Sequence, residues 1–531
     1  MGTRDTALRH PRSSVIDPPP RPLSSGRPAP GLRARPWPQG IALAGVLALA
    51  AGLRFAALGH NSVWFDEAYV AGLAQAGWQD IVATLRLADA HPPLYYLLMK
   101  IWVHLAGTGE AAIRLPSACL SVLSVALTYA LTRRFAPGPV GLLSAFLVGV
   151  APFEIMVGQE ARMYALLDVL VLATTLTLVL SVERGRRLGW GLYAVLAALM
   201  VYTQYLGAVV LVAHGIWVAG WERRHLRAWA GSMVAAVVLY TPWIPSFWYQ
   251  TVHGNGWPWY RRGAGFLDLG DLFGLLAFGG SLFGMGSYFF PGTQGPAGTL
   301  AILLPFLVVL GWGIAALRSQ PRTLGIIALP AVVPLVALSA LSLAKLTFYP
   351  RWCSFVVPFY AMVLAQGMWK IASWDRGRRD LVLALLTVGV LCYNVPVLAR
   401  YYFDPGFRPY PWRAAAALVE HQIRPGDFIL YVNTAAQISL SYYVRDPHPS
   451  LTLIPGEASF GAERTGGFTD AEAARLARQH PRVWLIATPP FTAEMQQRLL
   501  PTLMSAFRVA GQRTYPAIWI HLLEAKSPAR P

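Results

Sequence analysis

Charged residues are scarce in this sequence. Asp, Glu, Lys and Arg together make up 13% of its 531 residues, whereas about 25% is typical of soluble proteins. A soluble protein of this length would fold into several domains, and each of them would need a charged surface. The shortage therefore excludes a soluble enzyme. Apolar residues take the place of the missing charges: they make up 55% of the chain, and the mean hydropathy is +0.44.

Cysteine is rarer still, and acidic residues are outnumbered. Cys119, Cys353 and Cys392 lie in or beside apolar segments, with no CxxC pair or Cys/His spacing. This pattern is typical of small core residues and not of a metal or redox site. The chain has 26 acidic and 44 basic residues, a net charge of +18. Because the basic residues lie between apolar segments and not on one face of a soluble domain, we expect no nucleic-acid partner.

The apolar residues are concentrated in segments as long as membrane-spanning helices, roughly 17–22 residues each. We therefore predict an α-helical polytopic membrane protein with about eleven transmembrane helices, in a membrane domain at 39–398. The expected spans are 41–58, 115–132, 138–157, 164–182, 189–205, 206–221, 228–247, 298–317, 323–343, 352–369 and 380–398.

The basic residues between these segments predict the orientation. Residues 1–38 are rich in Pro, Ser and Arg without apolar periodicity, so we expect a disordered cytoplasmic tail. With the N-terminus inside, every inner loop is basic, as the positive-inside rule requires. Segment 93–106 is short and contains Lys100 and His104, so we expect a helix along the outer membrane surface. The outer segments of this multi-pass plasma-membrane protein are then 59–113, 248–297 and 399–531.

The last outer segment, 399–531, differs from the rest in composition. Strand-like runs alternate with helical stretches, a pattern typical of a small α/β domain. We expect this domain outside the membrane. Its predicted strands are 428–432, 483–487 and 518–523, and its predicted helices are 414–422, 471–480 and 494–507.

Polar residues gather at the outer ends of the predicted spans. Asp66 and Glu67 follow the first span, and two adjacent carboxylates suit a general base or a metal ligand, or the cap of a helix N-terminus. His91 precedes Pro92 and Pro93. Arg114 opens the second span, where an arginine can extend to the lipid headgroups or hold a phosphate.

A second polar group follows the third span. Glu160, Tyr164 and Asp168 are spaced by four residues, which predicts one shared helix face. Asp168 would then lie about 12 Å further along the axis than Glu160, and a carboxylate at that depth indicates function or a buried partner. Arg162 lies in the same stretch. Arg351 is predicted to lie on the outer side, where the positive-inside rule leaves few basic residues.

Carboxylates and cations around an outer-facing membrane cavity suit a substrate with a lipid tail, an anionic head and a leaving group. The spacing does not name the substrate, but a sugar carried on a polyprenyl phosphate has these parts and makes two demands on the site. A carboxylate would take the proton from the acceptor hydroxyl as it attacks the anomeric carbon. Fixed cations would stabilise the charge that develops on the phosphate as the bond breaks.

Several of these motifs, in this order over roughly residues 40–440, resemble a known family. The chain is similar to the GT-C membrane glycosyltransferases, specifically the bacterial branch of the dolichyl-phosphate-mannose protein mannosyltransferases (glycosyltransferase family 39-like). That branch is similar to the aminoarabinose transferases of lipid A. The matching residues are Trp64–Ala68, His91–Leu94, Ile113–Ser117, Gln159–Tyr164, Tyr349–Trp352, Pro358, Pro411–Ala414 and Pro425–Asp427.

The resemblance implies a GT-C fold and roles for individual residues. It implies that Asp66, paired with Glu67, is the catalytic base, and that Arg114 binds the lipid phosphate, with Arg162 and Arg351 as additions. His91 stands where the aminoarabinose branch has an acid near a metal, so we name no certain cofactor and leave a divalent metal open. The predicted substrate-binding residues are His91, Arg114, Glu160, Arg162, Tyr164 and Arg351.

We therefore predict an inverting hexosyl- or pentosyltransferase of the cell envelope. Its donor would be a polyprenyl-phosphate sugar, and its acceptor a lipid, glycan or protein at the outer face. Three alternatives remain: an oligosaccharide ligase or polymerase of the same fold, a polyprenyl-lipid or polysaccharide transporter, and a non-catalytic receptor whose α/β domain binds glycan. A transporter should carry polar groups through to both sides of the bilayer, whereas here they lie mainly at the outer ends.

Overall fold

The computed structural model describes residues 36–89, 91–253, 296–343, 350–404, 410–444, 448–454, 468–488 and 495–526. Residues 36–531 form one compact unit. The predicted disordered tail lies outside the described residues, apart from its last positions, which begin the first helix. Most of the outer segment predicted at 248–297 also lies outside them. The boundaries predicted at 38 and 398 stay predictions.

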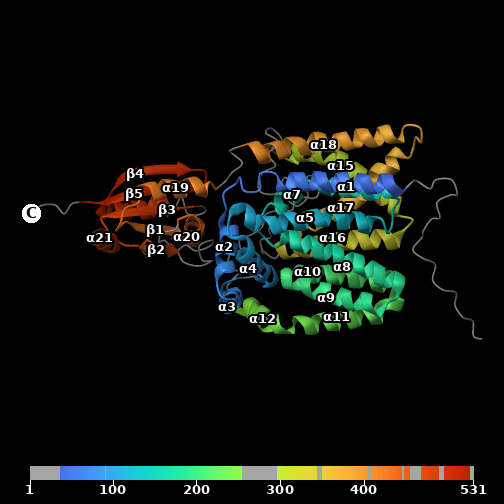
Figure 1. Cartoon of the computed structure of the whole chain (residues 1–531), viewed down its shortest axis with the longest axis horizontal. Helices are drawn as coiled ribbons and strands as arrows, with labels where there is room; N and C mark the ends of the chain where they lie inside the picture. The colour runs from blue at the N-terminus through green and yellow to red at the C-terminus, as the bar shows by residue number, and fades with distance from the viewer. Residues whose placement is uncertain are drawn as a thin grey trace, which may run out of the picture. The chain divides into compact units, whose positions relative to one another are not determined.

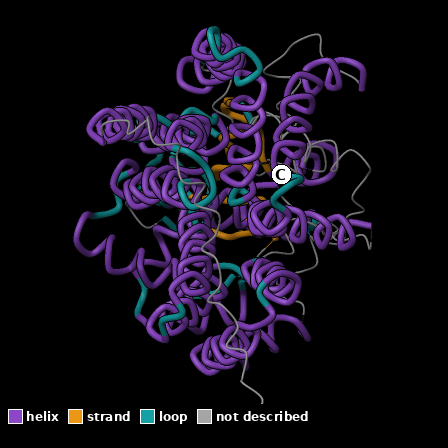
Figure 2. Tube along the Cα trace, turned by 90° about the vertical axis from the view of Figure 1, so that its right-hand side faces the viewer, coloured by secondary structure: helices purple, strands orange, loops and turns teal. Residues whose placement is uncertain are grey.

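Long helices that lie side by side form most of the structure (Figure 1). Seen roughly along their axes in Figure 2, they surround one another as a bundle, and the strands are confined to one small sheet. The bundle helices are α1 (Pro36–Phe55), α5 (Glu110–Thr132), α6 (Gly138–Gly149), α7 (Pro152–Gly158), α8 (Tyr164–Arg184), α9 (Arg187–Thr203), α10 (Gly207–Trp221), α11 (Leu226–Tyr240), α15 (Pro296–Leu317), α16 (Pro321–Leu343), α17 (Val356–Ala372) and α18 (Arg379–Phe403).

The polytopic helical fold predicted from the sequence is confirmed. Among the described residues, five helices are long and apolar enough to cross a membrane, or six if α6 and α7, bent by 62° at their break, form one span. The expected spans fall on the bundle helices, and the span at 138–157 falls on the bent pair. The span at 228–247 covers α11, η2 (Thr241–Trp243) and the start of α12 (Ile244–His253). In the other apolar helices the part whose side chains are described, such as Gln39–Phe55 of α1 and Leu304–Leu317 of α15, is shorter than 18 residues, so the number eleven stays a prediction.

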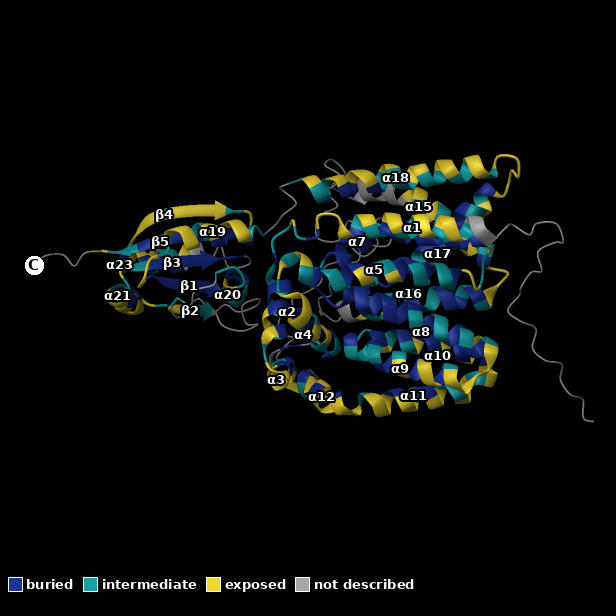
Figure 3. Cartoon of the chain, viewed as in Figure 1, coloured by how far each residue is buried: buried dark blue, intermediate teal, exposed yellow. Residues whose placement is uncertain are grey.

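The helix surfaces fit a lipid solvent. In α11, Val234, Val237 and Val238 are all more than half exposed, and exposed residues run along the outward sides of α11 and α18 (Figure 3). Inside, polar side chains are satisfied locally: Thr128 and Thr132 donate to the carbonyls four residues earlier in α5. Hydroxyls bonded within their own helix and valines exposed along its outer side are what a bundle surrounded by lipid requires.

Short helices gather at one end of the bundle (Figure 1). They are α2 (Phe65–Gln75), α3 (Trp78–Ala88), α4 (Leu94–Ala106) and α12 (Ile244–His253). The predicted surface helix at 93–106 is helical as expected. It has 13 residues, too few to cross a bilayer. Its Lys100 is buried and donates to the carbonyl of Ala76 at the end of α2, which explains a lysine in this apolar segment.

The C-terminal part is a small α/β fold around a five-stranded sheet of order β2-β1-β3-β5-β4. Strand β1 pairs in parallel with β2 and β3, and β5 is antiparallel to both β3 and β4. Its elements are α19 (Trp412–Gln422), β1 (Phe428–Asn433), α20 (Thr434–Ser441), β2 (Ser450–Ile454), α21 (Asp470–Gln479), β3 (Arg482–Ala487), η7 (Met495–Leu499), α23 (Leu500–Ala506), β4 (Phe507–Tyr515) and β5 (Ile518–Ala525).

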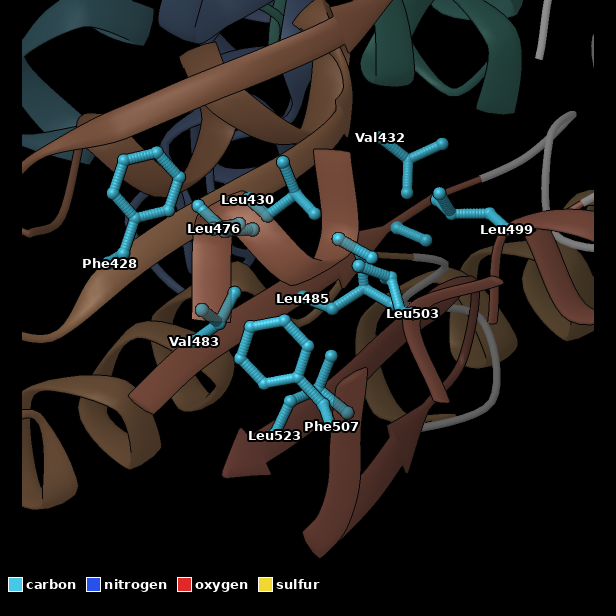
Figure 4. Packing of buried hydrophobic residues seen from close by; sticks show 12 residues of the cluster. Phe428, Leu430, Val432, Leu476, Val483, Leu485, Leu499, Leu503, Phe507 and Leu523 are labelled. Atoms are coloured by element: carbon cyan, nitrogen blue, oxygen red, sulfur yellow. The ribbon is translucent and has the colours of Figure 1, made fainter. Parts of the chain in front are cut away.

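The three strands predicted from apolar runs are the three inner strands of this sheet, because an inner strand is buried on both faces. Alternate residues of β1 point to opposite faces: Phe428, Leu430 and Val432 pack with α21 and α23 (Figure 4). Ile429 and Tyr431 pack with α19 and α20 on the other face. The sequence analysis missed the edge strands β2 and β4, of which β2 is short and β4 is largely exposed and polar.

Candidate active site

Asp66 and Glu67 occupy the first turn of α2, where carboxylates interact favourably with the helix dipole. The two side chains differ in surroundings: that of Asp66 is 15% exposed, and that of Glu67 only 1%. Their adjacency in sequence therefore does not make them equivalent, and each has its own set of partners.

Glu67 is held by a buried network of donors. Arg114 binds it through two parallel hydrogen bonds, Nε to Oε1 at 2.7 Å and Nη2 to Oε2 at 2.6 Å. The backbone N–H groups of Ala161 and Trp64 donate to the same carboxylate at 3.0 and 3.4 Å. With four donors around a buried carboxylate, Glu67 ties together α2, α5 and the turn before α8.

Arg114 uses its guanidinium entirely within the chain. Besides Glu67, it donates to the carbonyl oxygens of Leu58 at 3.0 Å, Asn61 at 2.8 Å and Ser62 at 3.1 Å. A guanidinium has five N–H donors, and these contacts engage all five. Arg114 therefore fixes the loop that leads into α2, and it has no donor left for a ligand in this arrangement.

Asp66 faces two other arginines. Its Oδ2 lies 3.3 Å from Nη2 of Arg351 and 3.7 Å from Nε of Arg162. Arg162 comes from the turn between α7 and α8, and Arg351 from the 3-10 helix η4 (Pro350–Cys353). Three segments far apart in sequence thus bring one carboxylate and two guanidinium groups together.

Aromatic rings flank these arginines. The guanidinium of Arg351 lies 4.8 Å from the centre of the Trp64 ring and 5.9 Å from that of Tyr164, and Arg162 lies 6.0 Å from Tyr164. The Nε of Arg162 is buried and has no hydrogen-bond partner among the described residues. A buried guanidinium with an unbonded N–H group favours an anion as a ligand. The anion would accept that hydrogen bond and so offset the cost of burying the N–H away from water.

Glu160 lies between these charges, in the turn before α8. Burial raises the pKa of its carboxyl to about 7; Arg351 and Arg162 lower it, and Glu67 and Asp66 raise it further. The prediction that Glu160 shares a helix face with Tyr164 and Asp168 is wrong, because residues 159–163 form a turn and α8 begins at Tyr164. Tyr164 and Asp168 do lie on α8, and both are buried.

Asp168 has a partner in the segment that carries Arg351. Its Oδ1 accepts a hydrogen bond of 2.6 Å from Ser354 Oγ. The backbone N–H of Ser354 in turn donates to the carbonyl of Arg351 at 3.4 Å. The buried carboxylate expected at this depth therefore anchors the η4 turn to α8.

His91 leads to a residue that the sequence analysis missed. Its Nδ1 lies 2.6 Å from Oδ1 of Asp89, and the hydroxyl of Tyr96 donates to Oδ2 of Asp89 at 3.2 Å. Asp89 is buried and close enough to act on the charge of Arg162. An acid two residues before the His-Pro-Pro motif was the available signal. Among the described residues, no group of three or more His, Cys, Asp or Glu side chains is placed to hold a metal ion.

Comparisons with known proteins bear on the family and the fold. Residues 90–248 match the family described as dolichyl-phosphate-mannose-protein mannosyltransferase. No curated protein sequence matches the chain. ArnT from Cupriavidus metallidurans, in a structure bound to undecaprenyl phosphate, has the same fold with a TM-score of 0.61 and 14% identity, over 90% of this chain and 97% of that one.

The fold is also that of an archaeal enzyme. The Archaeoglobus fulgidus oligosaccharyltransferase, tethered to an acceptor peptide, matches with a TM-score of 0.55 and 11% identity, over 92% of this chain and 74% of that one. At such identities the likeness shows the fold. Together with the family match, it confirms the predicted resemblance to the GT-C membrane glycosyltransferases.

Proposed function

We propose that the chain is a multi-pass membrane glycosyltransferase of the GT-C class, and that it moves one sugar from a polyprenyl-phosphate carrier to an acceptor hydroxyl with inversion at the anomeric carbon. The family match and the shared fold support this class. The observation that carries this proposal is the contact of Asp66 with two arginines, at 3.3 and 3.7 Å. A proton acceptor and two fixed cations in contact match the two demands of the reaction.

Asp66 is the proposed general base. The acceptor oxygen forms a bond to the anomeric carbon, its proton passes to Asp66, and the bond between that carbon and the phosphate oxygen breaks. The electron pair of the broken bond stays on the phosphate. Arg351 and Arg162 stabilise this growing negative charge, and the surrounding protein strengthens the interaction by excluding water.

The phosphate role belongs in this proposal to Arg162 and Arg351, and not first to Arg114. All five N–H groups of Arg114 donate to Glu67 and the loop carbonyls. Arg114 therefore orients the site and does not bind the phosphate in this proposal. Arg162 has a buried Nε without a hydrogen-bond partner among the described residues. Support for a phosphate ligand also comes from ArnT, whose structure holds undecaprenyl phosphate in the same fold.

The proposed site faces the outside of the plasma membrane, with the N-terminus in the cytoplasm. Helix α5 supports this orientation: it begins at Glu110, near the site, and ends at Thr132, directly before Arg133 and Arg134. At 1.5 Å per residue these basic residues lie about 34 Å from the site end. Basic residues at the far end favour a cytoplasmic location for that end.

Sugar transfer by the purified protein in liposomes tests the proposal. The protein is supplied with radiolabelled polyprenyl-phosphate sugars, with matched pyrophosphate-linked donors in a parallel series, and with lipid, glycan and peptide acceptors. Transfer from a monophosphate donor supports the proposal. Transfer only from pyrophosphate donors would establish the ligase alternative, and movement of intact donor across the bilayer without transfer would establish a transporter.

A further inference from the structure

The loop that precedes Asp66 is bound by the C-terminal α/β part of the chain. Arg413, the second residue of α19, donates from Nη2 to the carbonyl of Gly59 at 2.9 Å, and its backbone N–H donates to Ser62 Oγ at 3.2 Å. The same guanidinium forms an ion pair with Glu110 at the start of α5, with Nε 3.2 Å from Oε1.

Tyr443 makes a second connection to this loop. Its hydroxyl accepts a hydrogen bond of 2.6 Å from the backbone N–H of Val63 and donates to Oε1 of Glu110. Burial, together with Glu110, raises the pKa of Tyr443, so the phenol keeps its proton and remains a donor. The neighbouring Tyr442 donates to the carbonyl of Thr108.

The bundle holds the same loop from its other side. Arg114 donates to the carbonyls of Leu58, Asn61 and Ser62. Glu110 and Arg114 are four residues apart on α5, and therefore lie on one helix face. One face of α5 thus carries both the residue that binds the loop directly and the residue that binds Arg413 and Tyr443.

We propose that the α/β part positions the general base: Arg413 and Tyr443 hold the loop at residues 59–63, and so set the place of Asp66, three residues further on. This inference rests on the proposed role of Asp66. Neither residue touches the carboxylate, so both are positioning residues. A displacement of about 1 Å at a reacting group can cost about 10²-fold in rate, which makes such a connection consequential.

Kinetics of Arg413→Ala and Tyr443→Phe in the full-length protein give the first test. Asp66 would be displaced while Arg162 and Arg351, on other segments, stay in place. We therefore expect kcat to fall about 10–100-fold with the KM for the donor nearly unchanged. Arg508→Ala is the matched control, since Arg508 forms an ion pair with Glu524 in the same sheet, away from the loop. A kcat within twofold of wild type for the Arg413→Ala, Tyr443→Phe double variant would overturn the inference.

A reversible disulfide gives the second test. Because Ser62 Oγ lies 3.2 Å from the Arg413 nitrogen, the two Cα atoms are within about 7 Å, close to the upper limit for a disulfide. The Ser62→Cys, Arg413→Cys variant should be slow when reduced and recover on oxidation, whereas Arg413→Cys alone should not recover. A bond confirmed by mass spectrometry without recovery of kcat would contradict the inference.

A failure of the proposed function can be distinguished from a failure of this inference. Wild type and Asp66→Asn are assayed in the same preparation, and their ratio reports on the base alone. If Asp66→Asn is inactive while Arg413→Ala, Tyr443→Phe and their double variant are as fast as wild type, the proposed function stands and the inference is wrong. If Asp66→Asn transfers sugar normally, both the role of Asp66 as the base and this inference are overturned, while the transfer itself still supports a glycosyltransferase.

Discussion

Glu67 and Arg114, 47 positions apart in sequence, form a buried pair with two parallel hydrogen bonds of 2.7 and 2.6 Å. Next to it, Asp66 faces Arg351 and Arg162 at longer distances. The two adjacent carboxylates thus divide two tasks between them. Glu67, whose oxygens accept four hydrogen bonds, holds the site together. Asp66, with longer contacts, remains able to exchange its arginine partners for substrate.

Removal of the Arg114 side chain should therefore destabilise the folded protein. Loss of one partner of a buried ion pair typically costs about 3–5 kcal/mol, because the other charge is left uncompensated. We expect Arg114→Ala to lower the melting temperature strongly in detergent, and Arg114→Lys to recover only part of it, because an ammonium cannot form the two parallel bonds. A stable Arg114→Ala protein that has lost donor binding would restore the phosphate role to Arg114.

Removal of Arg351 or Arg162 should act on donor binding. Hydrogen bonds to charged groups contribute about 1.5–3 kcal/mol each, so each alanine variant should bind polyprenyl phosphate about 10–100-fold more weakly. Titration calorimetry with short-chain polyprenyl phosphate in detergent measures this directly. Arg508→Ala, an exposed arginine of the α/β part, serves as the control, and equal affinity in all variants would refute the assignment.

Asp168 should hold Arg351 in place through Ser354. Because Asp168 accepts the hydroxyl hydrogen bond of Ser354, Asp168→Ala and Ser354→Ala should each weaken donor binding. Asp168→Asn keeps an acceptor oxygen and should be milder. Each alanine change combined with Arg351→Ala should cost less than the sum of the separate effects, since all three act through one contact. Strict additivity in these double variants would separate Asp168 from the site.

Glu160 should make stability depend on pH. Its folded pKa of about 7 exceeds the ordinary value of 4.5, so between these values the unfolded chain releases a proton that the folded chain keeps. The contribution of Glu160 to the free energy of unfolding is fully present below pH 4.5. It is lost as the pH rises towards 7, and the loss is at most about 3 kcal/mol. Glu160→Gln lacks this loss, so its melting temperature should rise relative to wild type between pH 5 and 8. A constant difference would contradict the raised pKa.

The sequence predicted what depends on local pattern. Apolar length located the helices, and the inner strands such as β1 were recognisable because both of their faces are buried. Edge strand β4 was missed because its exposed polar residues carry no such signal. The turn at Glu160 was missed because spacing alone cannot show where a helix begins.

Contacts between distant segments were beyond sequence reasoning. Asp66 and Glu67 were both chosen from the sequence, but their separate roles depend on which arginine packs against which carboxylate. That is decided by where α5, the turn before α8 and η4 place Arg114, Arg162 and Arg351. Asp89 and the loop contacts of Arg413 likewise became visible only in three dimensions.

The most direct test of the account is the single-turnover rate of Asp66→Asn with bound polyprenyl-phosphate sugar, compared with wild type and with Glu67→Gln. Asp66→Asn keeps the shape but removes the proton acceptor. General-base catalysis typically supplies about 10²–10⁴-fold in rate, so we expect a loss of that size, with donor affinity and melting temperature near those of wild type. Glu67→Gln should instead lower the melting temperature first, because its carboxylate pairs with Arg114. A single-turnover rate for Asp66→Asn within a few-fold of wild type would contradict the account.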